Sequence, residues 1–497
     1  MISKDSLPDD GPPRRGRAAT DAAHDVGGLP SREQILGALA AIVGERETLP
    51  GDSPSARYAL SDATAPRGIV GTADAVVTPA SAGEVAAVMA WCYERGVALV
   101  ARGGGTGLAG GAVPQGGVVV DLRRMDRLLA IEPELWRMHV QAGMTTANVQ
   151  RLARESGLLF PPDPGAAESS TIGGNIATNA GGPHAFKYGV TGRWVTGIEV
   201  VVPPGRVVRL GGTLRKDAAG YDLAALLVGS EGTLGIVTAA WLRLVPAPEV
   251  TIPVVAGYPS ARAGCAAVAA VMGSGIQAAA LDYLDAGALS AAAAGFPGGL
   301  PDGTGFALVA EADGDATEAE AVARELEEAL GEHATFVRRM GDRAAVRNLW
   351  AWRDGVAIAV AARRGAKASE DVVVPLERLG EAVEQTVEIG RRHGLEACSW
   401  GHAGDGNLHA TFLVDPHDPA ELERAAHAEQ ELFAMAVELG GSVSGEHGLG
   451  SLKSGTLARY WDAEALALHD GLKRLFDPRG LMNPGKKLAV SASAPPD

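Results

Sequence analysis

Three short stretches of this chain concentrate glycine and other small residues. They are 102–112 (RGGGTGLAGGA), 161–182 (PPDPGAAESSTIGGNIATNAGG) and 229–238 (GSEGTLGIVT). The chain holds 66 glycines among its 497 residues, about twice the usual share, and their spacing follows no period that would indicate collagen. Clustered glycine lets a backbone approach another group closely, so we predict that these stretches surround a ligand.

The first stretch lies between two predicted strands, 97–101 and 118–122. Its glycines from 105 to 110 satisfy G-x-G-x-x-G, the pattern of dinucleotide-binding turns. Such a turn requires a helix to begin within the glycines, whereas here Pro114 and two further glycines lead into the next strand. We therefore predict a strand–loop–strand unit whose backbone N–H groups can bind a diphosphate, and not a Rossmann turn.

The second stretch contains almost no large side chains. We predict that it lies flat against a planar ligand, with Ser170, Thr171, Asn175 and Asn179 as polar contacts. Two isoleucines within it would anchor it to a core, which argues against a floppy loop. The third stretch is a weak signal by itself.

Charge and cysteine content exclude several kinds of protein. The net charge is −16, from 44 Lys and Arg against 60 Asp and Glu, so the surface repels nucleic acid and anionic lipid. The three cysteines are far apart and form neither a disulfide framework nor a CxxC metal pair, which fits a reducing compartment. We find no apolar run of about 18 residues and expect no transmembrane segment. We expect a cytoplasmic protein, with a peripheral place at the inner face of a membrane left open.

Two histidine-containing stretches in the second half predict a metal site. In 400–409 (WGHAGDGNLH) the central glycines form a turn, across which His402 can approach His409. The stretch 444–448 (SGEHG) adds Glu446 and His447. Two imidazoles and one carboxylate would hold a divalent metal and leave coordination positions open for a substrate. The alternative is a hydrogen-bonded cluster against a cofactor.

Arg353 follows two tryptophans in 348–353 (NLWAWR). From these residues alone we favour an amphipathic helix with a solvated arginine. The alternative is an arginine that binds a substrate carboxylate through two hydrogen bonds.

Six motifs in this order give the chain a resemblance to a known family: GGGTGLAGGA, TIGGNIATNAGG, GSEGTLGIVT, GHAGDGNLH, SGEHGLG and DPRGLMNPGK. Over roughly residues 35–490 the chain resembles the FAD-dependent oxidoreductases of the vanillyl-alcohol oxidase (PCMH-type) superfamily. Within it, the chain is similar to the D-2-hydroxyacid dehydrogenase branch, which includes D-lactate dehydrogenase, the glycolate oxidase flavin subunit and D-2-hydroxyglutarate dehydrogenase.

The resemblance implies an α+β fold. A PCMH-type FAD-binding domain of two α/β subdomains would be followed by an α+β cap domain with an antiparallel sheet, which binds the substrate. The boundary falls near Pro246–Pro248, where the glycine-rich composition gives way to alternating helices and strands. The expected segments are a disordered tail (1–30), the FAD-binding domain (31–248), the cap domain (249–440), a segment returning to the flavin (441–490) and a second disordered tail (491–497).

The resemblance also implies which residues bind FAD. Residues 103–111 would wrap the diphosphate, 162–182 would line the isoalloxazine and ribityl, and the third stretch would contact the adenine side. The residues so implied are Gly103, Gly104, Gly105, Thr106, Gly107, Leu108, Ala109, Gly110, Gly111, Pro162, Asp163, Ser170, Thr171, Gly173, Gly174, Asn175, Ala177, Asn179, Gly181, Gly182, Gly232, Ile236, Val237 and Asn483. The diphosphate loop lacks a histidine for covalent attachment, so we expect non-covalent FAD.

By the same resemblance His402, His409 and Glu446 match metal ligands for zinc or a similar ion, His447 matches the catalytic base, and Arg353 matches the carboxylate-binding arginine. The implied reaction oxidises a D-2-hydroxy acid such as lactate or glycolate to the 2-oxo acid, by hydride transfer to flavin N5. A separate electron acceptor is expected, and a homodimer is left open. The alternative is an FAD-dependent transferase that resembles alkylglycerone-phosphate synthase.

The chain departs from the hydroxyglutarate enzymes of this branch at three positions. Where those enzymes carry a threonine, a lysine and an asparagine, this chain has Ala357, Ser369 and Thr411, with Lys367 displaced by two residues. We therefore do not expect a hydroxyglutarate dehydrogenase.

Overall fold

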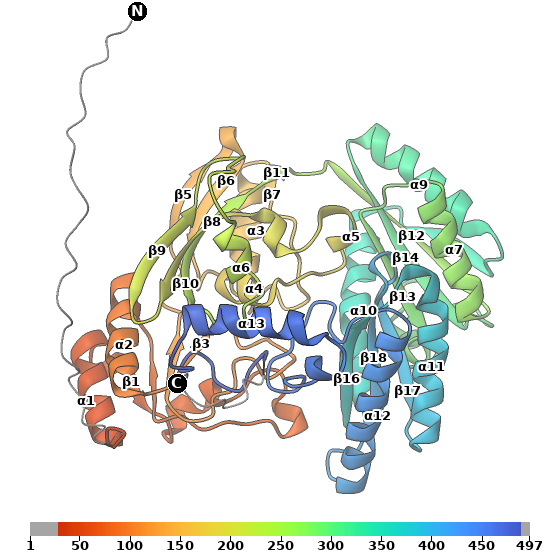
Figure 1. The fold of residues 1–497 in the computed structure, drawn as a ribbon. Coiled ribbons are helices and arrows are strands. Elements are labelled where there is room, and N and C mark those ends of the chain that lie inside the picture. The colour runs from red at the N-terminus through yellow and green to blue at the C-terminus, as the bar shows by residue number, and fades with distance from the viewer. Residues whose placement is uncertain (1–27, 489–497) are drawn as a thin grey trace, which may run out of the picture.

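The computed structural model describes residues 28–488. Nearly all of the predicted N-terminal tail and the whole of the C-terminal one lie outside this range. The described chain forms two lobes, an N-terminal lobe (28–248) and a C-terminal lobe (249–440), and the last residues run back along the first lobe (Figure 1). Helices and mostly antiparallel sheets together make the predicted α+β fold.

The first sheet of the N-terminal lobe has the order β1-β2-β4-β3. Its strands are β1 (Thr48–Pro50), β2 (Ala75–Val77), β4 (Val118–Asp121) and β3 (Leu99–Arg102), and β4 lies parallel to both β2 and β3. Helices α1 (Arg32–Val43) and α2 (Ala82–Arg95) share its core. The predicted strand–loop–strand unit is confirmed, because no helix separates β3 from β4 in the described chain.

The second sheet is antiparallel throughout and has the order β5-β6-β10-β8-β9. Its strands are β5 (Leu128–Glu132), β6 (Arg137–Gln141), β10 (Ile236–Arg243), β8 (Val195–Val202) and β9 (Arg206–Gly211). Around it lie α3 (Thr146–Glu155), α4 (Ile172–Thr178), α6 (Leu223–Leu227) and the short pair of β7 (Leu158–Leu159) with β11 (Val245–Pro246). The short helix α5 (Ala185–Tyr188) instead contacts the C-terminal lobe. One hydrophobic core joins both sheets of this lobe.

The C-terminal lobe is built on one antiparallel sheet of seven strands. The order is β15 (Phe336–Arg339), β12 (Val250–Tyr258), β14 (Phe306–Gly314), β13 (Ala280–Asp285), β17 (Ala397–His402), β18 (Asn407–Val414) and β16 (Ala366–Val373). Helices α7 (Ala261–Gly273), α9 (Ala316–Gly331), α11 (Leu379–Arg392) and α12 (Pro419–Glu438) share a core with one face. Helices α8 (Ala286–Ala292) and α10 (Arg343–Ala362) pack in the core on the other.

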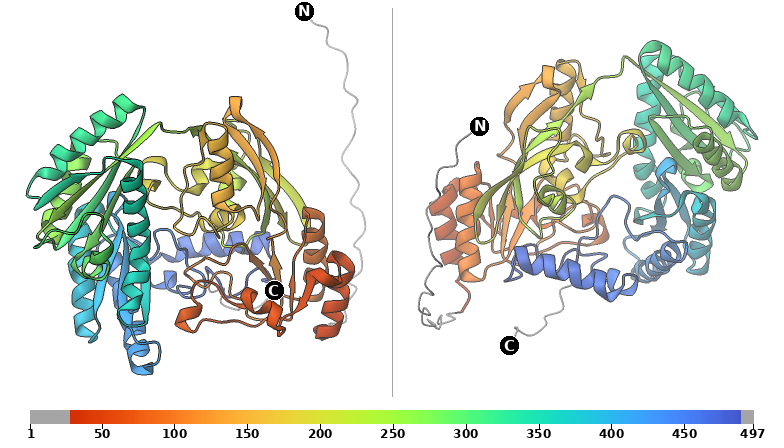
Figure 2. Two further views of the ribbon diagram at one scale, coloured as in Figure 1. Left: turned by 180° about the vertical axis from the view of Figure 1, so that it is seen from behind. Right: turned by 45° about the horizontal axis from the view of Figure 1, so that its top comes forward.

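The C-terminal segment connects the two lobes. Helix α13 (Ala463–Phe476) lies along the N-terminal lobe in every view (Figure 2). After it, Met482 forms a bridge with Leu99 of β3, and the Tyr93 hydroxyl donates to Asp477 Oδ1 at 3.0 Å. These contacts bring the end of the described chain to the strand that precedes the first glycine stretch.

Candidate active site

A cavity of about 600 Å³ lies where the lobes meet. The N-terminal lobe lines it with all three glycine stretches, and the C-terminal lobe lines it with Arg353, His402 and His409. Glu446 and His447 come from the loop that follows the C-terminal lobe. The sequence motifs of both halves therefore share one cavity.

The first two glycine stretches contact each other in the cavity wall. A Cβ atom on Gly104 would lie 2.0 Å from the carbonyl oxygen of Ser169, and one on Gly103 would lie 2.4 Å from Thr171 Oγ1. No side chain fits between backbones at that separation. Glycine at these two positions allows the close packing of the two stretches.

The second stretch is partly helical, which the sequence analysis did not predict. Thr171 caps α4 by accepting from the N–H of Gly174. Asn175 donates to Thr146 Oγ1 at 2.7 Å, and Ser170 Oγ lies 2.7 Å from the same oxygen. Local hydrogen bonds to a helix cap outweighed the low helix propensity of the glycines.

Most of the residues predicted to bind the cofactor line the cavity. Five do not: Gly110, Pro162, Asp163, Asn179 and Asn483. Asn483 instead connects the first and third glycine stretches, because its Nδ2 donates to the carbonyls of Gly111 at 2.9 Å and Glu231 at 2.7 Å. Its Oδ1 is buried and has no partner among the described residues.

The hairpin of β17 and β18 brings His402 and His409 together, as predicted. Their rings are 5.4 Å apart and nearly perpendicular. Glu446 Oε1 lies 3.4 Å from His402 Nε2 and 3.6 Å from His409 Nε2. The three donor atoms lie within 4.8 Å of one another, which suits a single cation.

Asp282, on the neighbouring strand β13, orients this group. Its Oδ1 accepts from His402 Nδ1 at 2.7 Å, and its Oδ2 accepts from Arg353 Nε at 2.6 Å. Burial opposes ionisation, but Arg353 and His402 together lower the pKa of Asp282 to about 2. Burial opposes protonation of His402, but Asp282 and Glu446 together hold the pKa of His402 well above its usual value. Because a carboxylate can only accept, the Nδ1 that faces Asp282 carries a proton, and a cation bound beside Glu446 would displace the second proton from Nε2.

His447 stacks on His409, with ring centroids 5.2 Å apart and planes 5° apart. Burial and the neighbouring His447 lower the pKa of His409 to about 3, so His409 is neutral, as a metal-ligating imidazole must be. His409 Nδ1 is buried without a partner among the described residues. His447 Nε2 lies 4.0 Å from Glu446 Oε1.

Comparison with known proteins now identifies the family. Residues 73–211 match the family described as FAD binding domain, and residues 247–487 match FAD linked oxidases, C-terminal domain. The glycolate oxidase subunit GlcD of Bacillus subtilis is 38% identical over 429 residues, which cover 84% of this chain and 90% of that protein. The chain belongs to the FAD-linked oxidases.

This FAD-linked oxidase is an oxidoreductase related to glycolate oxidase and D-lactate dehydrogenase. The D-lactate dehydrogenase of Anaerostipes hadrus is 34% identical, over 83% of this chain and 89% of its own. Two solved structures share the fold: p-cresol methylhydroxylase (TM-score 0.75, 18% identity, 92% of this chain and 96% of that one) and 4-ethylphenol oxidase from Gulosibacter chungangensis (TM-score 0.74, 19% identity, 93% and 98%). An alkyldihydroxyacetonephosphate synthase is a more distant neighbour (TM-score 0.69, 18% identity, 92% and 85%). At such identities these structures bear on the fold alone.

The prediction that Arg353 is a solvated arginine, which the neighbouring residues alone favoured, is wrong. Its side chain is buried on α10 and lines the cavity, so it is not a solvated arginine. The sequence did not predict that Asp282 would bind Arg353. Asp282 lies about 70 residues earlier in the chain, and its strand ALDYLD contains no recognisable motif.

Two of the three positions where the oxidase departs from the hydroxyglutarate branch, Ala357 and Ser369, line the cavity, and so does the displaced Lys367. Ser369 Oγ lies 2.7 Å from Thr411 Oγ1, and the Lys367 ammonium lies 5.2 Å from the centroid of the Trp400 ring. None of the helices in residues 28–488 combines the length and the apolar composition that crossing a bilayer requires.

Proposed function

We propose that this FAD-linked oxidase converts a D-2-hydroxy acid of the lactate or glycolate type into the 2-oxo acid. The observation that carries the proposal is the shared cavity, whose glycine-rich wall faces Arg353, His447 and the His402–His409–Glu446 group. A flavin-binding wall and an acid–base group must face each other if a hydride and a proton are to leave one substrate.

FAD, when bound, supplies the hydride acceptor. Its contacts in this proposal are mostly backbone groups of residues 103–111 and the small residues of the second stretch, which leave room for a planar ring. The loop 102–112 holds no histidine, so the cofactor is non-covalent.

The donor set of two imidazoles and one carboxylate fits a divalent cation, with zinc as our assignment. A cation held there would lower the pKa of a coordinated hydroxyl group. His402 would ligate through Nε2, because Asp282 holds the proton on Nδ1. His409 would also ligate through Nε2, the atom that faces Glu446.

The remaining residues bind the substrate and move its proton. Arg353 uses Nε to hold Asp282, so its two terminal nitrogens are available for the substrate carboxylate. His447, beside Glu446 at the cavity wall, takes the hydroxyl proton as C2 loses its hydride. The reduced enzyme then passes its electrons to a separate acceptor.

Two residues that line the cavity together with Arg353 favour a small substrate side chain. Ala357 offers only a methyl group, and the Ser369 hydroxyl is already paired with Thr411. Both features support a monocarboxylate over a dicarboxylate.

The test is anaerobic flavin reduction with a panel of D- and L-2-hydroxy acids, including 2-hydroxyglutarate, before and after treatment with a chelator. We expect lactate or glycolate to bleach the flavin absorbance, and the chelator to slow it. No bleaching by any acid would overturn the proposal, and group exchange without bleaching would point to a transferase.

A further inference from the structure

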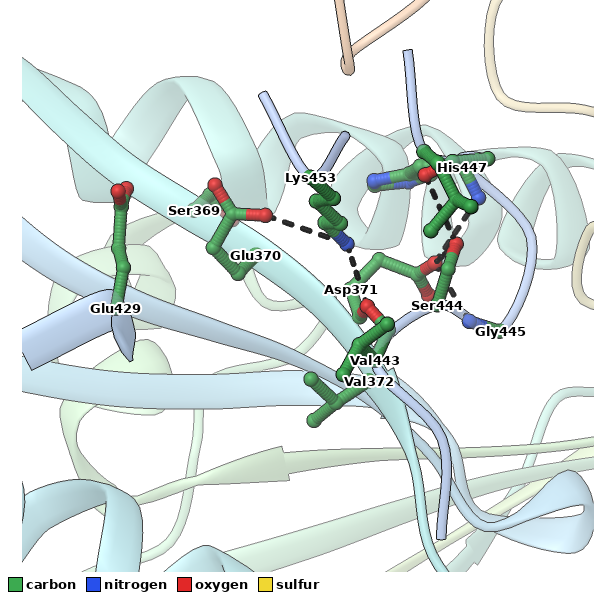
Figure 3. Close-up of polar contacts among 12 residues, drawn as sticks. Ser369, Glu370, Asp371, Val372, Glu429, Val443, Ser444, Gly445, His447 and Lys453 are labelled. Atoms are coloured by element: carbon green, nitrogen blue, oxygen red, sulfur yellow. Dashed lines mark hydrogen bonds and ion pairs between the residues drawn. The ribbon is translucent and has the colours of Figure 1, made fainter. Parts of the chain in front are cut away.

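Asp371 of β16 accepts hydrogen bonds from the whole loop that carries Glu446 and His447. Its Oδ2 accepts from the Ser444 hydroxyl at 2.9 Å and from the backbone N–H groups of Gly445 (2.7 Å), Glu446 (2.8 Å) and His447 (2.9 Å). Figure 3 shows the Asp371 side chain beside Ser444 and Gly445 of this loop. Four donors on one oxygen fix three consecutive peptide planes.

The other carboxylate oxygen connects Asp371 to the histidine hairpin. Asn407 Nδ2 donates to Asp371 Oδ1 at 2.6 Å and to the carbonyl of Val372 at 3.0 Å. Asn407 begins β18, two residues before His409. One buried carboxylate therefore links the strand that carries His409 to the loop that carries Glu446 and His447.

Lys453 fixes the far side of the same loop. Its ammonium donates to the carbonyls of Asp371 and Val443, both at 2.8 Å, and lies 3.2 Å from Glu370 Oε2 (Figure 3). The side chain is 2% exposed. The backbone and the side chain of Asp371 thus both hold residues 443–453.

We infer that Asp371 is a positioning residue, which sets the backbone of residues 445–447 so that Glu446 and His447 face the cavity. The expected changes in kcat rest on the proposed function, whereas the expected changes in the backbone of residues 445–447 rest on the hydrogen bonds alone. Asp371, His409 and His447 have donor atoms close enough to suggest a second metal group. Both oxygens of Asp371 are already taken by five protein donors, which favours positioning over ligation.

All five groups that contact the side chain of Asp371 are hydrogen-bond donors, so position 371 requires a side chain whose two outer atoms both accept hydrogen bonds. An asparagine at 371 would place its NH₂ either against the four donors of the loop or against Asn407 Nδ2. In the second orientation the amide oxygen still accepts from the loop but without the charge, so Asp371→Asn should weaken the hydrogen bonds of the loop in either case, with almost no change in side-chain volume.

The experiment compares Asp371→Asn with Asp285→Asn as a matched control in FAD-loaded enzyme. Asp285 is also buried in the same sheet and accepts from the N–H groups of Ser399 (2.6 Å) and Ala288 (2.9 Å), outside the loop. We expect faster amide hydrogen exchange at residues 445–447 only in Asp371→Asn. We also expect its kcat and its affinity for added Mn²⁺ to fall about 10–100-fold, with KM less affected.

Two further variants complete the design. Ser444→Ala removes one donor and leaves three backbone bonds, so its exchange and kcat should stay near wild type. If Asp371→Asn does not fold, Asn407→Ala frees the other end of the carboxylate and should accelerate the same amides.

Unchanged amide exchange at residues 445–447 in Asp371→Asn, or in Asn407→Ala if Asp371→Asn does not fold, would overturn the inference. So would equal losses of kcat in Asp371→Asn and Asp285→Asn. If the wild type oxidises no 2-hydroxy acid, the proposed function fails, while the exchange rates still decide the role of Asp371.

Discussion

The imidazole of His402 is held by a 2.7 Å hydrogen bond from its Nδ1 to Oδ1 of Asp282. This bond leaves Nε2 pointing toward Glu446, 3.4 Å away. A carboxylate behind a histidine fixes the tautomer and raises the basicity of the free nitrogen. The geometry explains why two distant motifs can act as one group.

Replacing Asp282 tests this relationship. Asp282→Asn leaves the buried Arg353 without its counter-charge, so we expect about 3–5 kcal/mol of lost stability and about 10–100-fold lower kcat/KM. Denaturant unfolding and steady-state kinetics measure both. Asp315→Asn, at the exposed N-cap of α9, makes the same charge change and should lose little activity. Equal effects of the two variants would contradict the assignment.

The contact between the first two glycine stretches can be tested at Gly104. Gly104→Ala pushes a methyl group into the carbonyl of Ser169, so we expect at least about 1–3 kcal/mol of destabilisation and weaker FAD retention. Gly37→Ala is the control: it lies exposed on α1 with nothing near its Cβ and should stabilise by about 0.5–1 kcal/mol. FAD release on dilution and thermal unfolding provide the measurements. Full FAD retention by Gly104→Ala would refute the contact.

Because of Lys367, the free energy of unfolding should change with pH in the alkaline range. Burial lowers the pKa of Lys367 to about 8 from its usual 10.5, so the unfolded chain binds more protons between these values and stability rises with pH there. Lys367→Met should be more stable than wild type at pH 7, by about 1–3 kcal/mol, and the difference should shrink toward pH 10.5. A difference that is constant from pH 7 to 10.5 in urea unfolding would contradict this account.

His184 gives the opposite pH dependence at the junction of the lobes. Burial opposes its protonation, but Asp163 and Glu311, which contact its two ring nitrogens, hold the pKa of His184 well above its usual value. Its contribution to stability is complete below about pH 6.5 and is lost as pH rises through the folded pKa. The stability gap between wild type and His184→Gln should therefore narrow with rising pH. His417→Gln, at an exposed position, is the control variant.

Local sequence patterns predicted many of the elements. The alternation in LHATFLV became β18, the glycine turn before it brought His402 to His409, and the strand–loop–strand unit followed from Pro114. Each of these depends on residues close in the chain.

Long-range partners could not be predicted. Asp282 and Asp371 lie in ordinary strand sequences, and only the sheet order places β13 beside β17 and β16 beside β18. The helix in the second glycine stretch was also missed, since its stability comes from Thr171 capping and from tertiary contacts with Thr146.

The most direct test of the central claim is anaerobic flavin reduction in His447→Ala beside wild type, with the 2-hydroxy acid that the panel identifies. The account predicts that the variant retains FAD with an unchanged absorbance spectrum, while substrate no longer bleaches it. Bleaching at the wild-type rate would contradict the assignment of His447 and the shared site on which the proposal rests.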